Sequence, residues 1–294
     1  MKIYDCTTFY SEKMMLDLRF NILNNNVHKF VVVESSFSHS GEKKKFNFNI
    51  DDYPKFKDKI IYLKIYDEPT NLYRSKNKLI KPFYKRLNSI KRIEQSYDYM
   101  MKGINDAQQE DLIIISDNDE IPNLDSKQLK ESNKNFIVFK QLLFYYKFNL
   151  LHELMPWFGS KACKKKYLKS FSDLRNLKNK RYPFWRLDTY FSNIKETSVD
   201  IITDGGWHFT NIKTPEDLYI KMKNFGHHDE FDESKLTVDD LRKNINHGVV
   251  FYDHSADKTS QNKWSNKYKL KKIENNVLPK YLIENQNNYK EWFK

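Results

Sequence analysis

The sequence predicts an α/β fold, in which helices cover a sheet that contains parallel strands. Residues 112–115 are four branched apolar residues between an acidic pair and a polar loop, a pattern typical of a buried parallel strand. Strand-like and helix-like patterns alternate over the first half of the chain, as in βαβ units. The 294 residues are 39% hydrophobic and 15% aromatic, which is enough for a sizeable core.

The other elements of the first half follow from periodicity. Residues 1–6 and 29–34 are β-prone and predict two strands. Residues 11–24, between them, carry apolar side chains at helical spacing and predict an amphipathic helix. Residues 60–66 predict a third strand. Residues 82–102 have apolar or aromatic side chains every three or four positions, so we expect a long helix that leads into the apolar strand.

The second half contains shorter elements. Residues 126–132 predict a short helix, and the aromatic, β-prone run 136–149 predicts one or two strands. Residues 201–209 predict a further strand that leads into a turn at Gly205-Gly206-Trp207-His208-Phe209. A helix is expected over residues 215–225, because a threonine suited to the N-cap precedes a proline at the first helical position.

The loop after the apolar strand is the strongest candidate for a metal site. Ligands in open α/β sheets bind at the carboxyl ends of strands. In extended backbone Asp117 and Asp119 point the same way, so both carboxylates can meet one Mg²⁺ or Mn²⁺. Such a cation is usually completed by water and substrate phosphates, which predicts a nucleoside diphosphate as the guest. The alternative is an acidic turn that caps the next helix. An EF-hand is excluded, because Pro122 occupies the position that requires glycine.

Composition limits the compartment and the partners. No apolar run is long enough to cross a membrane, and the N-terminus lacks the apolar region of a signal peptide, so we expect a cytoplasmic protein. The two cysteines, Cys6 and Cys163, form neither a disulfide framework nor a zinc motif, which agrees with a reducing compartment.

The formal net charge is +12, and the segment from Lys161 to Arg181 holds nine Lys or Arg against the single acid Asp173. Such a segment attracts polyanions, among them an anionic membrane, a phosphorylated glycan and nucleic acid. Lys, Asn and Ile are abundant along the whole chain, so biased composition is the alternative source of the charge. We expect peripheral contact with the inner face of a membrane and no specific nucleic acid.

Several motifs carry a resemblance to a known family. They are Ile3-Tyr4-Asp5-Cys6 with Phe9 and Glu12, Phe30 to Glu34 followed by His39-Ser40-Gly41, Lys85-Arg86-Leu87-Asn88, Ser116 to Pro122, and Gly205-Gly206-Trp207-His208-Phe209 with Phe225-Gly226-His227. In this order they resemble glycosyltransferase family 17, the family of the β-1,4-mannosyl-glycoprotein β-1,4-N-acetylglucosaminyltransferase. The resemblance covers residues 1–255, which we expect to form one domain. Residues 256–294 would be a helical or partly ordered extension packed on it.

The resemblance implies a GT-A-like nucleotide-sugar-binding fold with a mixed, mostly parallel central sheet flanked by helices. It also implies a glycosyltransferase with a nucleotide-sugar donor, a divalent cation (Mn²⁺ or Mg²⁺) and inversion at the anomeric carbon. UDP-N-acetylglucosamine is the donor expected for the family. The acceptor would be a hydroxyl of a glycan or lipid-linked glycan, in the synthesis of a surface polysaccharide or glycoconjugate.

The expected site combines three groups of residues. The metal ligands are Asp117, Asp119 and His208. Inversion needs a base opposite the leaving group, for which the candidates are Glu120, Asp229 and Glu230. We favour the pair Asp229-Glu230, because a separate segment can stand across the sugar from the cation, whereas Glu120 is the candidate for fixing the loop.

Donor contacts are expected from residues near the ends of the strands and on the long helix: Glu34, His39, Arg86, Asn88, Asp117, Trp207 and His208. Trp207 can stack on a sugar face, and the glycines before it permit close approach of a ligand. Each residue has a structural alternative. A histidine can be satisfied inside a core, and Arg86 can belong to a solvated helix face.

Other classes of function remain open from the residues alone. A metal-dependent phosphoesterase or nuclease could use Asp117, Asp119 and a basic surface, and a non-catalytic polyanion-binding protein could use the basic surface alone. A glycosidase fits poorly, because the acidic cluster is too compact for two carboxylates that flank a sugar bond. Manganese-dependent binding of a nucleoside diphosphate would favour the transferase over the polyanion-binding protein, and hydrolysis of a generic phosphodiester would favour the phosphoesterase.

Overall fold

The computed structural model describes the chain except for residues 78–79, 225–230, 232–233 and 251–266. The chain divides into two compact units. The first consists of Met1–Gln141 and Trp157–His208, and the second of Leu142–Pro156 and Phe209–Lys294. The predicted boundary at residue 255 falls in a segment outside the described residues, so that division stays a prediction.

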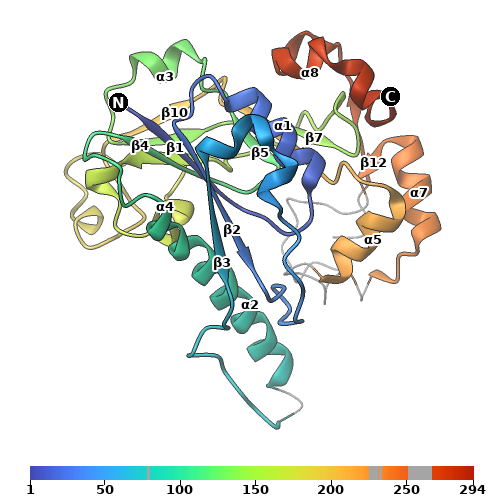
Figure 1. Cartoon of the computed structure of the whole chain (residues 1–294), viewed down its shortest axis with the longest axis horizontal. Coiled ribbons are helices and arrows are strands. Elements are labelled where there is room, and N and C mark those ends of the chain that lie inside the picture. The colour runs from blue at the N-terminus through green and yellow to red at the C-terminus, as the bar shows by residue number, and fades with distance from the viewer. Residues whose placement is uncertain (78–79, 225–230, 232–233, 251–266) are drawn as a thin grey trace. The chain divides into compact units, whose positions relative to one another are not determined.

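A seven-stranded sheet forms the centre of the first unit (Figure 1). Its order is β10-β6-β9-β4-β1-β2-β3. The strands are β1 (Ile3–Thr8), β2 (Lys29–Ser35), β3 (Ile60–Ile65), β4 (Leu112–Ser116), β6 (Phe136–Phe139), β9 (Lys161–Lys164) and β10 (Val199–Ile202). All neighbours pair in parallel except β9, which is antiparallel to β4 and to β6. The predicted α/β class, with a mixed and mostly parallel sheet, is confirmed.

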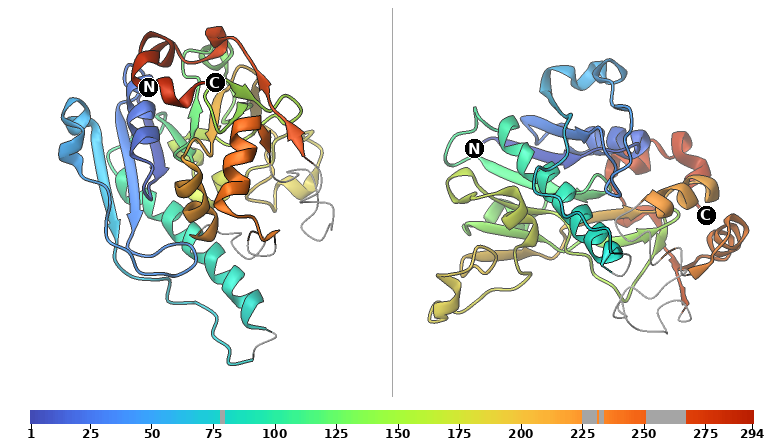
Figure 2. Two further views of the ribbon diagram at one scale, coloured as in Figure 1. Left: turned by 90° about the vertical axis from the view of Figure 1, so that its right-hand side faces the viewer. Right: turned by 90° about the horizontal axis from the view of Figure 1, so that it is seen from below.

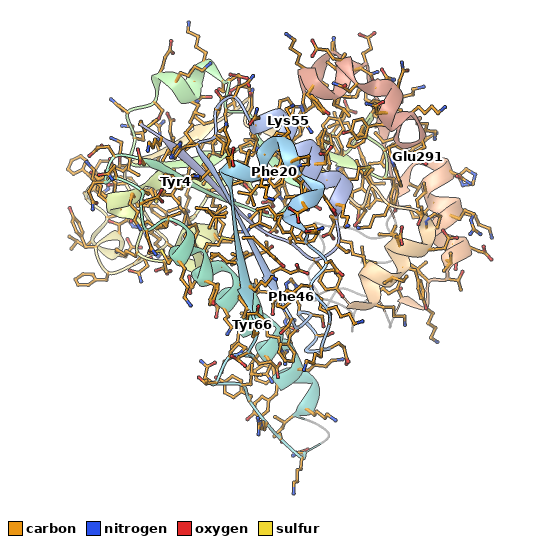
Figure 3. The ribbon with its side chains drawn as sticks, viewed as in Figure 1. Tyr4, Phe20, Phe46, Lys55, Tyr66 and Glu291 are labelled. Carbon is orange, nitrogen blue, oxygen red and sulfur yellow. The ribbon has the colours of Figure 1, made fainter. Side chains whose placement is uncertain are left out.

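The helices of the first unit cover this sheet. They are α1 (Lys13–Leu23), α2 (Lys81–Asp98), α3 (Lys127–Glu131) and α4 (Phe171–Asn176), with the 3₁₀ turns η1 (Ile50–Asp52), η2 (Pro54–Lys59), η3 (Tyr99–Gly103), η4 (Lys165–Tyr167) and η5 (Leu187–Thr189). Phe20 of α1 is buried against Phe30 of β2 at a ring distance of 4.6 Å (Figure 3). The long predicted helix is α2 continued by η3, and it packs on the sheet and on α4.

The apolar strand is buried as predicted, since every residue of β4 is buried. Its side chains join a core cluster with residues of β1, β2, β6 and α4, including Cys6, Val31, Val138 and Leu174. Burial of this apolar surface from five elements is the main source of stability for the first unit.

The predicted strand over residues 201–209 is two strands. β10 ends at Ile202, and β11 (Gly206–Thr210) pairs with β5 (Glu120–Pro122) in antiparallel register. Gly206 has φ of +111°, and a Cβ there would lie 2.2 Å from the carbonyl oxygen of Ile121. Only glycine fits this turn, so the chain leaves the large sheet here and lines up beside the aspartate loop.

The second unit combines an antiparallel ribbon with helices. β7 (Leu142–Tyr145) pairs with β8 (Leu150–Leu151), which pairs with β14 (Lys271–Lys272), and β12 (Val249–Val250) pairs with β13 (Tyr268–Lys269). Run 136–149 therefore holds two strands, β6 and β7. The helical elements are α5 (Pro215–Asn224), α7 (Val238–His247), α8 (Lys280–Glu284) and the turns η7 (Asn275–Val277) and η8 (Gln286–Trp292). No helix in the described part of the chain is long and apolar enough to span a bilayer.

Helices α5 and α7 pack on each other and share a core with the ribbon (Figure 1). Leu218 of α5 and Leu241 of α7 are fully buried. A capping box of Thr237 and Asp240 begins α7, and Gly248 in the left-handed conformation ends it.

Candidate active site

The aspartate loop is a tight turn between β4 and β5. The N–H of Glu120 donates to the carbonyl of Asp117 at 3.0 Å and closes the turn. The carboxylates of Asp117 and Asp119 are 38% and 20% exposed, respectively. Asn118 is buried, and its amide donates to the carbonyl of Glu12. The two aspartates therefore face solvent while the residue between them anchors the loop.

Arg175, from the last turn of α4, ties the acidic residues of this loop together. Its Nη2 donates to Asp117 Oδ2 at 2.6 Å and to Glu120 Oε1 at 3.0 Å, and its Nη1 donates to Glu120 Oε2 at 2.8 Å. The arginine side chain is only 16% exposed. A planar guanidinium suits such forked contacts, so the loop is held by charge-assisted hydrogen bonds.

The carboxylate of Glu120 accepts hydrogen bonds from three residues. Its side chain is fully buried, and besides Arg175 it accepts from the N–H of Asp117 at 2.9 Å and from Trp157 Nε1 at 2.7 Å. A Cβ at Gly159 would lie 2.2 Å from the Glu120 carboxyl carbon, so glycine is needed to leave room for this group. This arrangement supports the loop-fixing alternative for Glu120, while its catalytic assignment stays a prediction.

A buried ion pair holds the backbone of the loop. Arg19 of α1 and Asp5 of β1 are fully buried and share two hydrogen bonds of 2.7 and 2.5 Å. Arg19 Nη1 also donates to the carbonyls of Glu120 at 2.6 Å and Asp117 at 3.3 Å. The backbone of the loop is thereby fixed to the first strand and the first helix of the fold.

His208 lies next to the loop because β11 pairs with β5. Residue 208 stands opposite Glu120 in the register, and its Nε2 is 3.5 Å from Asp119 Oδ1. The imidazole packs on the Trp157 ring at 4.5 Å. Its Nδ1 is buried and has no hydrogen-bond partner among the described residues. The predicted grouping of Asp117, Asp119 and His208 is thus brought together at one edge of the fold.

The charges of this cluster move its protonation equilibria. Burial, together with Glu120 and Asp119, raises the pKa of Asp117 against the opposing effect of Arg175. Burial also acts to raise the pKa of Glu120, but the charges of Arg175 and His208 and the hydrogen bonds outweigh it, and the pKa is lowered. Burial and the charge of Asp117 raise the pKa of Tyr97, whose hydroxyl donates to Asp117 Oδ1 at 2.9 Å. Arg175 thus opposes the effect of burial on both acids.

The donor set of this edge fits a divalent cation only when substrate completes it. In the described part of the chain, no group of three or more His, Cys, Asp or Glu side chains is arranged to hold a metal alone. The Asp117 carboxylate accepts from Tyr97 and Arg175, which leaves further lone pairs on its two oxygens, and oxygen ligands suit Mg²⁺ and Mn²⁺. Water and phosphate oxygens would have to supply the remaining ligands.

Glu34, which was predicted to contact the nucleotide-sugar donor, makes structural contacts. Glu34 is buried and accepts from the N–H of Asn47 and Phe48 and from the Tyr62 hydroxyl, as well as from Lys44. These contacts fill its carboxylate, so a direct nucleotide contact would require their rearrangement.

His39 is half-buried, and its carbonyl accepts from Ser89 and Arg92 of α2. Glu12, whose carbonyl accepts from Asn118, also acts electrostatically on His39. Burial, with the charge of Arg92, outweighs Glu12 and lowers the pKa of His39 to about 4. A neutral imidazole at this place can donate to or accept from a ligand at neutral pH.

The two residues predicted on the long helix lie differently. The amide of Asn88 accepts from the N–H of Tyr73 at 2.8 Å and donates to its carbonyl at 2.9 Å, so it holds the segment before α2. Arg86 is exposed, as the solvated-face alternative expects. Trp207 is half-buried, opposite Ile121. Asp229 and Glu230 lie outside the described residues.

Sequence reasoning missed Arg175, Tyr97, Trp157 and the pair of Arg19 and Asp5. Arg175 was predicted only as one of the basic residues of segment 161–181. Arg19 lies among apolar positions of the first helix, and that placement of a charged residue was the available signal for a buried ion pair.

The basic segment is partly internal to the fold. Lys161 is buried and donates to the carbonyls of Arg175 and Leu177, and burial, with the charge of Arg175, lowers its pKa to about 7. Lys164 and Lys166 pair with Glu110, and Arg181 pairs with Asp200. With Arg175, five of the nine basic residues are occupied within the first unit.

Comparison with known proteins gives one family. Residues 1–167, more than half of the 294, match the model of Glycosyltransferase family 17. A comparison with curated proteins finds no match. The matched region includes β1, β2, α2 and the whole aspartate loop, and it ends before Arg175 and His208.

Proposed function

The chain belongs to glycosyltransferase family 17, and on that premise we propose a metal-dependent, inverting transfer of N-acetylglucosamine from UDP-N-acetylglucosamine to a glycan hydroxyl. Glycosyl transfer itself, with a sugar donor and a glycan acceptor, follows from membership of the family. The observation that carries the finer proposal is the aspartate loop, in which two partly exposed carboxylates stand on a turn fixed by the buried Arg19 and by Arg175.

Asp117 and Asp119, with His208 beside them, are the residues that would hold Mn²⁺ or Mg²⁺. The chemistry supplied by the bound cation is neutralisation of charge on the leaving nucleoside diphosphate. Tyr97 donates to one oxygen of the Asp117 carboxylate and Arg175 to the other, so this side chain is oriented before any ligand arrives. Such preorganisation lowers the cost of building the site when donor binds.

Glu120 acts in this proposal as a positioning residue. Its carboxylate is buried and accepts from Arg175, Trp157 and the loop backbone, so it has no path to an acceptor hydroxyl in this arrangement. The base is then sought in the segment of Asp229 and Glu230, as the sequence predicts. His39 and Trp207 are the proposed nucleotide and sugar contacts, since both lie close to segments that hold the loop.

The acceptor is proposed to be a glycan or lipid-linked glycan of a surface polysaccharide or glycoconjugate, and the setting the cytoplasmic side of a membrane. Neither a phosphoesterase nor a polyanion-binding protein is favoured by a specific contact of the site. Five basic residues of segment 161–181 make ion pairs or hydrogen bonds within the fold, which argues against that segment as a polyanion-binding surface.

Thermal stabilisation by a panel of nucleoside diphosphates, with and without Mn²⁺, tests the proposal. UDP should raise Tm only with the cation, and Asp117→Asn with Asp119→Asn should abolish this increase while the unliganded protein stays folded. Asp125→Asn, on the exposed side of the next loop, is the matched control and should keep the increase. Stabilisation by UDP without metal, or an equal response of the double variant, would contradict the metal assignment. Release of UDP from UDP-N-acetylglucosamine, compared with other UDP-sugars, then identifies the sugar.

A further inference from the structure

One loop of the first unit presents a dense apolar surface. Phe184, Trp185, Leu187, Tyr190 and Phe191 each leave between 67% and 91% of their surface exposed. Among the described residues, no other stretch of eight holds more than two strongly exposed large apolar side chains. Single exposed apolar residues are normal, but a contiguous group of this kind marks a surface that contacts something apolar.

The loop is braced by its own polar groups. Asp188 accepts two hydrogen bonds from Arg186, of 2.7 and 2.8 Å, and one from Lys195 of 2.8 Å. At its base, the N–H of Lys178 donates to the carbonyl of Ile194 at 2.8 Å. The charged groups are thus paired within the loop and the apolar side chains are left outside. Figure 2 shows this loop, in yellow, standing out from the edge of the seven-stranded sheet.

The surroundings of the apolar group are cationic. Residues 178–195 contain five Lys or Arg and one acid, Asp188. Lys178 and Lys180, at the base of the loop, are exposed, and the ammonium of Lys180 lies 5.0 Å from the centre of the Tyr182 ring. Apolar and aromatic side chains next to exposed lysines are the arrangement that binds the interface of an anionic bilayer.

We propose that residues 183–191 are a membrane-docking loop. Trp185, Tyr190 and Phe191, with their neighbours, enter the boundary between headgroups and acyl chains, and Lys178 and Lys180 face anionic headgroups. Trp and Tyr favour this boundary because their rings are amphipathic. This contact differs from the one expected for segment 161–181, most of whose charges are occupied within the fold.

Two other occupants fit the loop less well. A sugar platform needs ring faces and nearby polar groups, but the Phe184 and Trp185 rings meet at 81° and Leu187 offers neither. A second copy of the chain would bring the exposed Lys178 and Lys180 against the same two lysines, which opposes self-association. An anionic bilayer satisfies both the apolar and the cationic parts.

Flotation with phosphatidylcholine vesicles, with and without phosphatidylglycerol, tests the proposal at physiological salt and needs neither donor nor metal. The wild type should float with the anionic vesicles. Trp185→Ser with Phe191→Ser should weaken partition by about a hundredfold, or about tenfold for each ring. Lys178→Ala with Lys180→Ala should weaken it roughly 30-fold, or about fivefold for each lysine. Phe83→Ser, at an exposed aromatic of α2, is the matched control and should change nothing.

Brominated lipids give a second readout, because they should quench tryptophan fluorescence of the wild type and not of Trp185→Ser. The proposal is overturned if the wild type stays unbound with anionic vesicles, or if the double aromatic variant floats as well as the control. It is also overturned if light scattering shows that the wild type is a dimer and the aromatic variant a monomer, while the wild type does not bind vesicles. Unchanged circular dichroism and Tm will confirm that these surface variants are folded.

Discussion

The ion pair between Arg175 and Glu120 gives the sharpest prediction. Arg175→Met keeps much of the apolar stem but leaves the fully buried Glu120 without its cation. Breaking a buried pair by removing one partner costs about 3–5 kcal/mol. The contact with Asp117 adds less than about 1 kcal/mol, because that carboxylate is more than a third exposed. We therefore expect the free energy of unfolding at pH 7.5 to fall by about 3–5 kcal/mol, and Tm by roughly 10 °C.

The pH dependence separates this electrostatic cost from lost packing. In the wild type the lowered pKa of Glu120 stabilises the fold above the unfolded value, and this stability is lost as pH falls through the folded pKa. Without Arg175, burial raises the pKa of Glu120, so the variant gains from protonation as pH falls. The difference between the two proteins should accordingly shrink from pH 7.5 to pH 4.5.

Urea unfolding followed by circular dichroism measures both quantities. Glu120→Gln added to Arg175→Met removes the buried charge and should recover part of the loss, as a double-mutant cycle would show. Arg242→Met, at an exposed pair with Glu216 and Asp239, is the control and should cost at most about 1 kcal/mol. A loss that is the same at pH 7.5 and pH 4.5, or strict additivity of the two substitutions, would refute the reasoning.

Three further predictions rest on single contacts. Gly206→Ala should lower the free energy of unfolding by about 3 kcal/mol in urea titrations, because its φ is +111° and a Cβ would meet the Ile121 carbonyl. Gly248→Ala should cost less, because a Cβ there would make only ordinary contacts of 3.5 and 3.6 Å with Leu150 and Lys294. His39→Gln should reduce the loss of stability between pH 6.5 and pH 4. The wild-type imidazole has its pKa lowered to about 4, so in this range it gains a proton on unfolding and unfolding becomes more favourable as pH falls. An unchanged dependence of stability on pH would show that His39 is solvated. Cys6 and Cys163 are buried, and burial raises the pKa of both thiols, that of Cys163 to about 12. Neither thiol should therefore react with a disulfide reagent at pH 8 until urea is added. Rapid labelling of the native protein would contradict this burial.

Local signals were enough for most elements of the fold. The apolar run of β4 and the Thr214-Pro215 start of α5 each carry their own information, and both elements lie where the sequence placed them. The segment 201–209 was predicted as one strand that leads into a turn, whereas the structure divides it into β10 and β11. Its division depends on how Gly206 passes the backbone of Ile121, a contact between segments more than 80 residues apart that periodicity does not report.

The candidate site divides in the same way. Asp117 and Asp119 follow from alternation along one loop, and His208 was added by the resemblance. Arg175 makes its contacts with Glu120 and Asp117 across 55 and 58 residues, respectively. No local pattern distinguishes such an arginine from a surface lysine, because its role arises only when β9 and α4 fold against β4. Glu34 shows the opposite case, in which a residue at a plausible strand end has its carboxylate filled by the neighbouring loop.

The position of the family match gives this division a functional meaning. The match ends at residue 167, so it contains the aspartates and the supporting pair of Arg19 and Asp5 but not Arg175 or His208. Asp117 and Glu120 depend on cationic support, because burial acts to raise the pKa of each carboxyl and Arg175 opposes this effect. In this chain the support comes from α4, which Lys161 holds by two carbonyl contacts at its C-terminal end. Arg175, which lies beyond the matched region, thus orients the Asp117 carboxylate and opposes the rise of its pKa.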